Sequence, residues 1–361
     1  MEKTGRTASS LFRAVTVPGE GGVGGLAYTR RMRLAMRIAA AVSCAWVVAV
    51  VLVSGQGGGQ AQPPATDTVA PDIPGVIMGG TKVIAIKDGF SSTEGPIALP
   101  DGSVLFTETN ANRIIRIDKD NVISTYLENT NGSNAIAFDA KGRMITVQRG
   151  PGHVQIGVIA PKGSEATLAD NFDGNPNDLV VDKKGGVYFT VPGPLAQPQG
   201  SAPPATPFVP VVHYIAPGGK AVKAADGIEN PNGIQMSPDE KTLYVNNTRG
   251  EYLLAFDVRP DGSLGNRRNF AKYEGVTKTG ANTVSGADGL AVDTEGRVYA
   301  ATAIGVQVFS RQGQHLGTIP LSRSPQNLAF AGADKKTLYV VGRGAAYRIQ
   351  MQAQGFQGRA K

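Results

Sequence analysis

The sequence is poor in cysteine, histidine and tryptophan. Its 361 residues include one Cys, one Trp and three His, against 47 Gly and 23 Pro. A single Cys excludes an intrachain disulfide framework and a zinc site built on several thiolates. Three scattered His leave no basis for a site with several imidazole ligands, so a bound metal would need oxygen ligands, as hard cations do.

Positive charge is concentrated near the start of the chain. The formal net charge is +7, and residues 1–61 hold seven basic and two acidic residues. An arginine cluster there precedes an uncharged apolar run over residues 38–53, and small residues and Gln follow the run. This order is typical of a secretory signal peptide, and the run is short for a membrane span.

We therefore expect residues 1–61 to be a leader, either a cleaved signal peptide or an uncleaved membrane anchor. The protein would then be exported, to the periplasm or to the medium. Cys44 and Trp46 both lie in this leader. The rest of the chain is only mildly basic and has no basic run or nucleic-acid-binding motif, so no nucleic-acid partner is expected.

The remainder divides into a short linker, a repetitive domain and a tail. Residues 55–75 are rich in Gly, Gln and Pro, which predicts a flexible linker over residues 62–80. From residue 81 to 352, short strands alternate with Gly, Asp and Asn turns. Residues 353–361 are expected to form a C-terminal tail.

One unit recurs six times in that domain. Each unit has a polar turn followed by a short apolar strand, and a further strand usually comes after it. Six units of about four short strands predict an all-β fold, a six-bladed β-propeller, because packing such sheets around an axis buries both of their faces. The turns and strands lie at residues 100–107, 140–146, 184–190, 239–245, 294–300 and 334–340.

Each unit also has an oxygen-bearing residue at the start of the apolar strand that precedes the turn. In a propeller the first strand of each blade lines the central channel, so six such residues would converge at its mouth. Two are carboxylates and the others are amides, a set that suits a divalent cation, most simply Ca²⁺. The six residues are Glu94, Asn134, Asn177, Asn232, Asp288 and Gln326.

Four of these positions lie in motifs that occur in the order of a known family. The motifs are Glu94-Gly-Pro, Asn175-Pro-Asn177-Asp-Leu, Pro231-Asn232-Gly-Ile and Ala287-Asp288-Gly-Leu. As a set they resemble the senescence-marker-protein, gluconolactonase and luciferin-regenerating-enzyme family. The resemblance covers residues 85–350 and implies a six-bladed propeller that hydrolyses sugar lactones with a divalent metal in its channel.

The resemblance also implies roles for individual residues. Glu94, Asn232 and Asp288 would be metal ligands, and Asn177 would be a fourth ligand or a substrate contact. Asp288 is the candidate catalytic base that activates water, with another carboxylate as the alternative, because an Asp bound to a cation is a weak base. No Gly-x-Ser-x-Gly motif occurs, so a serine esterase has no support in the sequence.

Further residues on the same face are candidates for contacts with a substrate. Asn134 shares the channel position, and Arg149 and Arg249 each follow the second strand of a unit, where they bind substrate or remain surface arginines. The family often has Thr-Asp-Pro where this chain has Val191 between Thr and Pro, so the identity of the lactone stays open. A Pro-rich run over residues 193–212 predicts a lid or a solvated insertion.

The sequence thus predicts a metal-dependent hydrolase that opens a sugar lactone, with a small-molecule substrate and a divalent metal, most simply Ca²⁺, as cofactor. The metal would polarise the lactone carbonyl and activate water. The alternative is a propeller without enzymatic activity that binds a ligand or partner and holds a structural calcium ion, since the fold alone does not decide between them.

Overall fold

The computed structural model describes residues 62–195, 207–359 and 361. The predicted leader, with Cys44, and part of the Pro-rich run lie outside these residues. The described residues form strands and one short 3₁₀ turn, η1 (Thr109–Ala111). Among them, no helix has the length and apolar character needed to cross a membrane.

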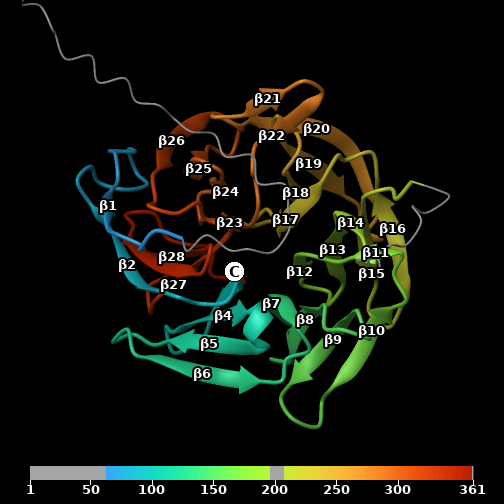
Figure 1. Ribbon diagram of the computed structural model, residues 1–361. Helices are drawn as coiled ribbons and strands as arrows, with labels where there is room; N and C mark the ends of the chain where they lie inside the picture. The colour runs from blue at the N-terminus through green and yellow to red at the C-terminus, as the bar shows by residue number, and fades with distance from the viewer. Residues whose placement is uncertain (1–61, 196–206, 360) are drawn as a thin grey trace, which may run out of the picture. The chain divides into compact units, whose positions relative to one another are not determined.

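Six antiparallel sheets stand in a ring around a central axis (Figure 1). Blade 1 consists of β3 (Thr93–Ala98), β4 (Val104–Glu108), β5 (Arg113–Ile117) and β6 (Ile123–Glu128). Blade 2 consists of β7 (Ser133–Phe138), β8 (Met144–Gln148), β9 (Gln155–Ala160) and β10 (Ala166–Asp170). Blade 3 consists of β12 (Leu179–Val181), β13 (Val187–Val191), β15 (Val211–Ile215) and β16 (Ala221–Ala225).

The other three blades follow in chain order. Blade 4 consists of β17 (Pro231–Met236), β18 (Thr242–Asn247), β19 (Tyr252–Val258) and β20 (Leu264–Lys272). Blade 5 consists of β23 (Leu290–Val292), β24 (Val298–Thr302), β25 (Gly305–Phe309) and β26 (His315–Ile319). Blade 6 consists of β27 (Asn327–Ala331), β28 (Thr337–Gly342), β29 (Ala345–Gln350), β2 (Lys82–Asp88) and β1 (Thr68–Val69). The predicted six-bladed propeller is confirmed.

Two short strand pairs project from the blades. The pair β11 (Gly174–Asn175) and β14 (Gly193–Pro194) extends blade 3, and the pair β21 (Thr277–Thr279) and β22 (Asn282–Val284) connects blades 4 and 5.

The ring is closed by pairing the two ends of the domain. Strand β2 runs antiparallel to β29, with Val83 opposite Ile349 and Ala85 opposite Tyr347. In Figure 1 the blue β2 accordingly lies beside the red strands of the last blade. Blade 6 therefore takes its outer strands from the start of the domain, which ties the first blade to the last and leaves no open seam.

The segment 62–80 differs from its prediction as a flexible linker. Strand β1 pairs with β2, and the side chains of Ile73, Val76 and Ile77 are at most 1% exposed. They pack in the apolar cluster between blades 5 and 6. The Gly and Pro composition suggested a solvated chain, but three apolar side chains give the segment enough surface to bury.

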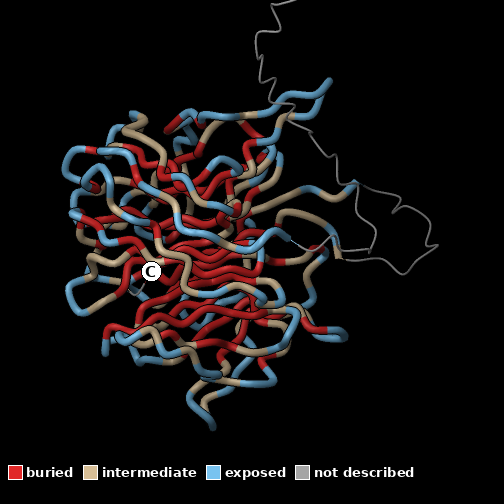
Figure 2. Tube along the Cα trace, turned by 60° about the vertical axis from the view of Figure 1, so that its left-hand side comes forward, coloured by how far each residue is buried: buried red, intermediate tan, exposed pale blue. Residues whose placement is uncertain are grey.

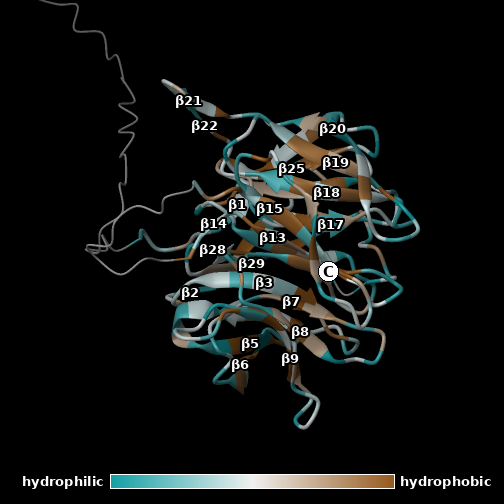
Figure 3. Cartoon of the chain, turned by 90° about the vertical axis from the view of Figure 1, so that its right-hand side faces the viewer, coloured by the Kyte–Doolittle hydropathy of each residue, from teal (hydrophilic) through white to brown (hydrophobic). Residues whose placement is uncertain are grey.

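Apolar clusters fill each of the six interfaces between neighbouring blades. At the interface of blades 5 and 6, the rings of Tyr299 and Phe330 meet edge to face with their centroids 5.0 Å apart. Buried strands run through the interior and exposed loops cover both ends (Figure 2), and hydrophobic stretches follow the strands (Figure 3). Because each sheet buries both faces against its neighbours, no blade has a core of its own.

Candidate functional site

The six channel positions predicted from the sequence are linked by hydrogen bonds between successive blades. On one side of the ring, Thr107 Oγ1 donates to the Asn134 carbonyl at 2.7 Å, and Asn134 Nδ2 donates to the Asn177 carbonyl at 3.0 Å. From blade 3 to blade 4, Thr190 Oγ1 donates to the Asn232 carbonyl at 2.7 Å. These bonds connect blades 1 to 4 at the axis.

The remaining bonds close the circle. The Gly233 N–H donates to the Asp288 carbonyl at 3.0 Å, and the Gly289 N–H donates to the Gln326 carbonyl at 2.7 Å. Gln326 Nε2 then donates to Glu94 Oε1 at 3.2 Å, which returns to blade 1. The structure therefore brings all six predicted positions together around one axis.

Local irregularities in the inner strands place these residues. Strands β3, β7 and β17 each shift register where Glu94, Asn134 and Asn232 stand. Such a bulge turns a side chain away from the alternation of the strand, and bulges are common beside active sites. In blades 3 and 5 the inner strand begins only after Asn177 and Asp288. These two residues are therefore also free of the alternating side-chain directions of a regular strand.

Glycine next to a channel residue permits the close approach of the inner strands. A Cβ on Gly233 would lie 2.0 Å from the Asp288 carbonyl oxygen. A Cβ on Gly95 would lie 2.3 Å from the Asn134 carbonyl oxygen, and Gly95 also has a φ of +52°. The Gly of these motifs is therefore required by backbone contact and by backbone conformation.

The carboxylates at the axis repel one another in a dry environment. Burial raises the pKa of Asp288 well above its usual range, and the negative charges of Glu94 and Asp178 raise it further. Burial likewise raises the pKa of Glu94, against a hydrogen bond from Asn327 that lowers it. Desolvation and like charge both disfavour the ionised forms, so a cation bound between these groups would relieve the repulsion.

Two predicted metal ligands have an oxygen that no protein group satisfies. Within the described residues, Asn232 Oδ1 and Asp288 Oδ1 are buried and have no hydrogen-bond partner. Buried oxygens of this kind are rare and point to a bound group. The described residues contain no group of three or more His, Cys, Asp and Glu arranged as a metal site. The six channel positions offer two carboxylates and four side-chain amide oxygens as metal ligands, and such oxygens fit a hard divalent cation.

The arginines differ in their relation to the site. Arg149 is partly buried, and burial lowers the pKa of its guanidinium. The negative charges of Glu94 and Asp288 oppose that effect, so the guanidinium is close enough to interact with both carboxylates. Arg249 is exposed. Arg343 was not among the residues predicted from the sequence, and its positive charge lowers the pKa of Asp288. Arg343 follows the second strand of its blade and precedes Gly, as Arg149 and Arg249 do, so the repeat pattern could have identified it.

A cavity of about 490 Å³ opens beside Arg149 on the same face of the ring. Phe172, Leu195 and Pro151 contribute apolar surface to its lining, and His153 and Asn175 contribute polar groups. Its size lies in the range of small-molecule sites. It lies between the loops that follow β8, β10 and β14, so blades 2 and 3 form it.

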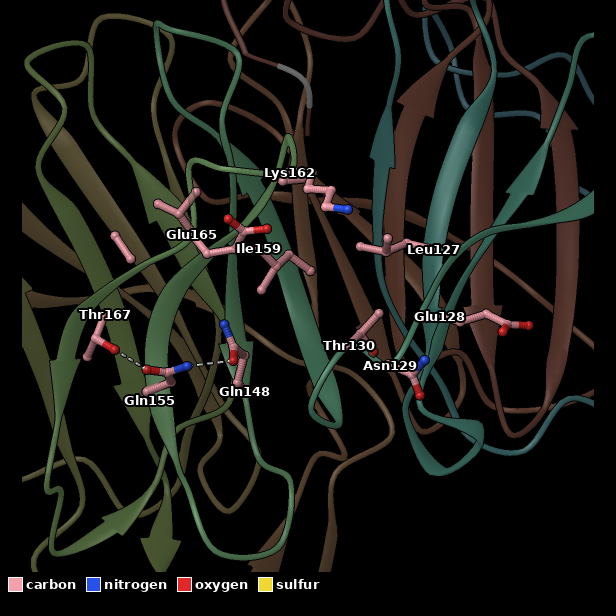
Figure 4. Close-up of a pocket in the computed structure, with 13 residues that line it drawn as sticks. Leu127, Glu128, Asn129, Thr130, Gln148, Gln155, Ile159, Lys162, Glu165 and Thr167 are labelled. Carbon is pink, nitrogen blue, oxygen red and sulfur yellow. Dashed lines mark hydrogen bonds between the residues drawn. The ribbon is translucent and has the colours of Figure 1, made fainter.

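A second hollow lies away from the axis, between the outer strands of blades 1 and 2 (Figure 4). Its volume is about 630 Å³, and the polar side chains of Gln148, Gln155 and Thr167 bond to one another along one wall. Glu128, Lys162 and Glu165 also line this hollow. None of the six predicted channel positions does, so the hollow is separate from the site at the axis.

Sequence reasoning missed two buried charged groups in the channel. Asp178 directly follows Asn177 and forms an ion pair with Lys361, whose Nζ lies 2.7 Å from Oδ2 and 2.9 Å from Oδ1. The other blades have an uncharged residue where blade 3 has Asp178, and this exception to the repeat was the signal available. No pattern in the sequence brings Lys361 to the channel.

The comparisons with known proteins agree with this architecture. The model of the SMP-30/gluconolactonase/LRE-like region matches residues 92–343. The gluconolactonase of Zymomonas mobilis is 25% identical over 321 residues, which cover 79% of this chain and 86% of that one. The lactonase drp35 of Staphylococcus haemolyticus is 26% identical over 247 residues, which cover 65% of this chain and 71% of that one.

A solved structure extends the likeness to three dimensions. A protein of Xanthomonas campestris, described as a gluconolactonase important in glucose secondary metabolic pathways, superimposes with a TM-score of 0.65 and 27% identity. The match covers 80% of this chain and 99% of that one. The family model spans most of the propeller and includes Glu94, Asn177, Asn232 and Asp288. This chain belongs to the SMP-30/gluconolactonase/LRE-like family.

Proposed function

We propose that this protein hydrolyses a sugar lactone at the channel mouth, with a divalent cation, most simply Ca²⁺, as cofactor. One observation carries the proposal: Asn232 Oδ1 and Asp288 Oδ1 are buried without a protein partner at the point where six blades converge. The relatives named gluconolactonase and lactonase support the reaction class.

Glu94, Asn232 and Asp288 would hold the cation, and Asn177 would be a fourth ligand or a substrate contact. When bound, such a cation acts as a Lewis acid toward a carbonyl oxygen. Burial keeps Glu94 and Asp288 from water and raises the pKa of both carboxyl groups. A bound cation would favour their ionised forms and so couple metal binding to loss of their protons.

Hydrolysis of a lactone adds water across one ester bond. The water oxygen bonds to the carbonyl carbon, the bond between that carbon and the ring oxygen breaks, and a proton reaches the ring oxygen. Asp288 is the proposed base that accepts the proton of the attacking water. The guanidinium of Arg149 lies near the two carboxylates, where it would orient substrate hydroxyls or a carboxylate.

The cavity beside Arg149 suits a compact polyhydroxylated ring. Its polar groups would bind hydroxyls, while Phe172 supplies an apolar surface for a sugar face. A sugar lactone is therefore the substrate class that this cavity favours over a long-chain ester.

The test is a panel of aldonolactones assayed with the wild-type protein and Asp288→Asn. We expect Asp288→Asn to lower kcat/KM by about 100-fold or more, the usual effect of losing a proton-transfer group. The control is Asp120→Asn, because the Asp120 side chain is 65% exposed and pairs only with an exposed Lys119. Unchanged turnover in Asp288→Asn contradicts the assignment, and a wild-type protein that binds lactones without turnover supports the binding alternative.

A further inference from the structure

The segment that follows β29 runs across the face of the ring opposite the cavity. The Gln352 N–H donates to the Val76 carbonyl, and the Phe356 N–H donates to the Val292 carbonyl of blade 5. The guanidinium of Arg359 then pairs with Glu240 at 3.0 Å and donates to the Met236 carbonyl of blade 4. The segment thus passes from blade 6 to blade 5 to blade 4 along the turns between inner and second strands.

This path brings Lys361 to the buried Asp178 at the channel. In Figure 1 the C mark lies at the centre of the ring, and in Figure 3 it lies on the side opposite the β21–β22 hairpin. The Lys361 side chain is 7% exposed, and that of its partner Asp178 is 1% exposed. A charged pair of this depth is costly to take out of water, and apolar side chains of similar volume often hold such a position equally well or better, so the pair itself contributes little to stability.

Asp178 is bound by groups that fix its position. Its Oδ1 accepts from the Leu179 N–H at 2.9 Å, and its Oδ2 accepts from the Ile234 N–H at 3.3 Å, in addition to both bonds from Lys361 Nζ. Each oxygen of the Asp178 carboxylate therefore accepts two hydrogen bonds, one from a backbone N–H and one from Lys361. Its negative charge raises the pKa of Glu94 and of Asp288, so it acts on both as a third carboxylate.

We propose that Lys361 is an internal counter-ion of the channel. Its ammonium group reaches Asp178 from the face opposite the cavity and sets how tightly Glu94 and Asp288 bind a divalent cation. This inference rests on the proposed function. Lys361 compensates Asp178, so Glu94 and Asp288 are the carboxylates that the cation and the nearby Arg149 and Arg343 have to balance. Lys361 is a positioning residue, because it acts through charge and through Asp178 and does not touch the substrate.

The charges of Asp178 and Lys361 predict an order of Ca²⁺ affinities among variants. Removing the ammonium by Lys361→Met makes the channel one charge more negative, and removing the carboxylate by Asp178→Asn makes it one charge more positive. The double variant restores the wild-type sum. A unit charge inside a protein changes the affinity for a nearby divalent cation by on the order of tenfold or more.

The experiment is calorimetric titration of metal-free full-length protein with Ca²⁺, for the wild type, both single variants and the double variant. We expect Lys361→Met to bind about tenfold tighter, Asp178→Asn about tenfold weaker, and the double variant within about threefold of the wild type. A merely structural role would lower the melting temperature of the single variants without this order.

Equal Ca²⁺ affinities in all four proteins overturn the inference and leave the proposed function in place. A wild-type protein that binds no divalent cation overturns both. If Lys361→Met does not fold, Asp178→Asn and the double variant remain, and the double variant must bind Ca²⁺ about tenfold tighter than Asp178→Asn.

Discussion

At the scale of single residues, the candidate site includes two buried oxygens that have no hydrogen-bond partner in the protein. Asn232 and Asp288 each hold one such oxygen, and the neighbouring carboxylate Glu94 is held by amide donors of blade 6. An unsatisfied buried oxygen destabilises the folded protein, and a ligand that contacts this oxygen would offset the loss.

The sequence located these residues because one position of the repeat carried oxygen in every unit. It could not locate Lys361, whose partner Asp178 lies 183 residues earlier in the chain. Their contact depends on the path of the tail across three blades, and no periodicity encodes that path. Arg343 was within reach of the sequence, because it repeats the Arg-Gly pattern of Arg149 and Arg249.

The raised pKa values of Glu94 and Asp288 predict a pH dependence of stability in the absence of metal. Both groups start from ordinary values of 4.5 and 3.8, and the folded protein holds their protons to higher pH than the unfolded chain does. The folded state therefore binds more protons in that window, so the stability these groups allow is present at low pH and is lost as pH rises above about 4.5.

Urea unfolding of chelator-treated protein between pH 4.5 and pH 8 measures this effect. The wild type should lose stability with rising pH relative to the variant that carries both Glu94→Gln and Asp288→Asn, and saturating Ca²⁺ should remove most of the difference. Parallel pH profiles for the wild type and that variant would contradict the electrostatic description of the site.

At the scale of elements, the inner strands approach so closely that the channel requires glycine. The N–H of Gly233 bonds to the carbonyl of Asp288, and a side chain at Gly233 would meet that oxygen. In the motif Asn232-Gly, the sequence predicted a role only for Asn232, as a metal ligand. The structure shows that Gly233 allows the close contact between blades 4 and 5.

Gly233→Ala should therefore destabilise the protein by about 1–3 kcal/mol, because the added methyl group forces the two inner strands apart. Gly193→Ala is the matched control, since a Cβ there meets no atom within 4 Å. Its free energy of unfolding should stay within about 0.5 kcal/mol of the wild type. Equal stability of the two variants, measured by chemical denaturation, would refute the close approach.

At the scale of the whole molecule, the number of blades could be predicted from the sequence, but the closure of the ring could not. Six similar turns are visible as a local pattern, whereas the pairing of β2 with β29 joins residues near opposite ends of the domain. The packing of segment 62–80 could not be predicted for the same reason. Its three buried apolar residues contact side chains of blades 5 and 6, which are distant from them in the sequence.

The ring makes the channel a property of all six blades. Each blade contributes one position to the hydrogen-bonded circle, so no part of the chain holds the site alone. Binding of a cation at the axis should accordingly stabilise the whole domain, because the ligand binds only the folded ring.

We propose that the axis of the propeller binds one divalent cation on which lactone hydrolysis depends. The most direct test strips the protein with chelator, titrates Ca²⁺ back, and records bound metal and gluconolactone hydrolysis in the same samples. Activity should vanish on stripping and return in proportion to bound metal, reaching its maximum at about one ion per chain. Full activity in the stripped protein, or metal binding that restores stability without turnover, would contradict the claim.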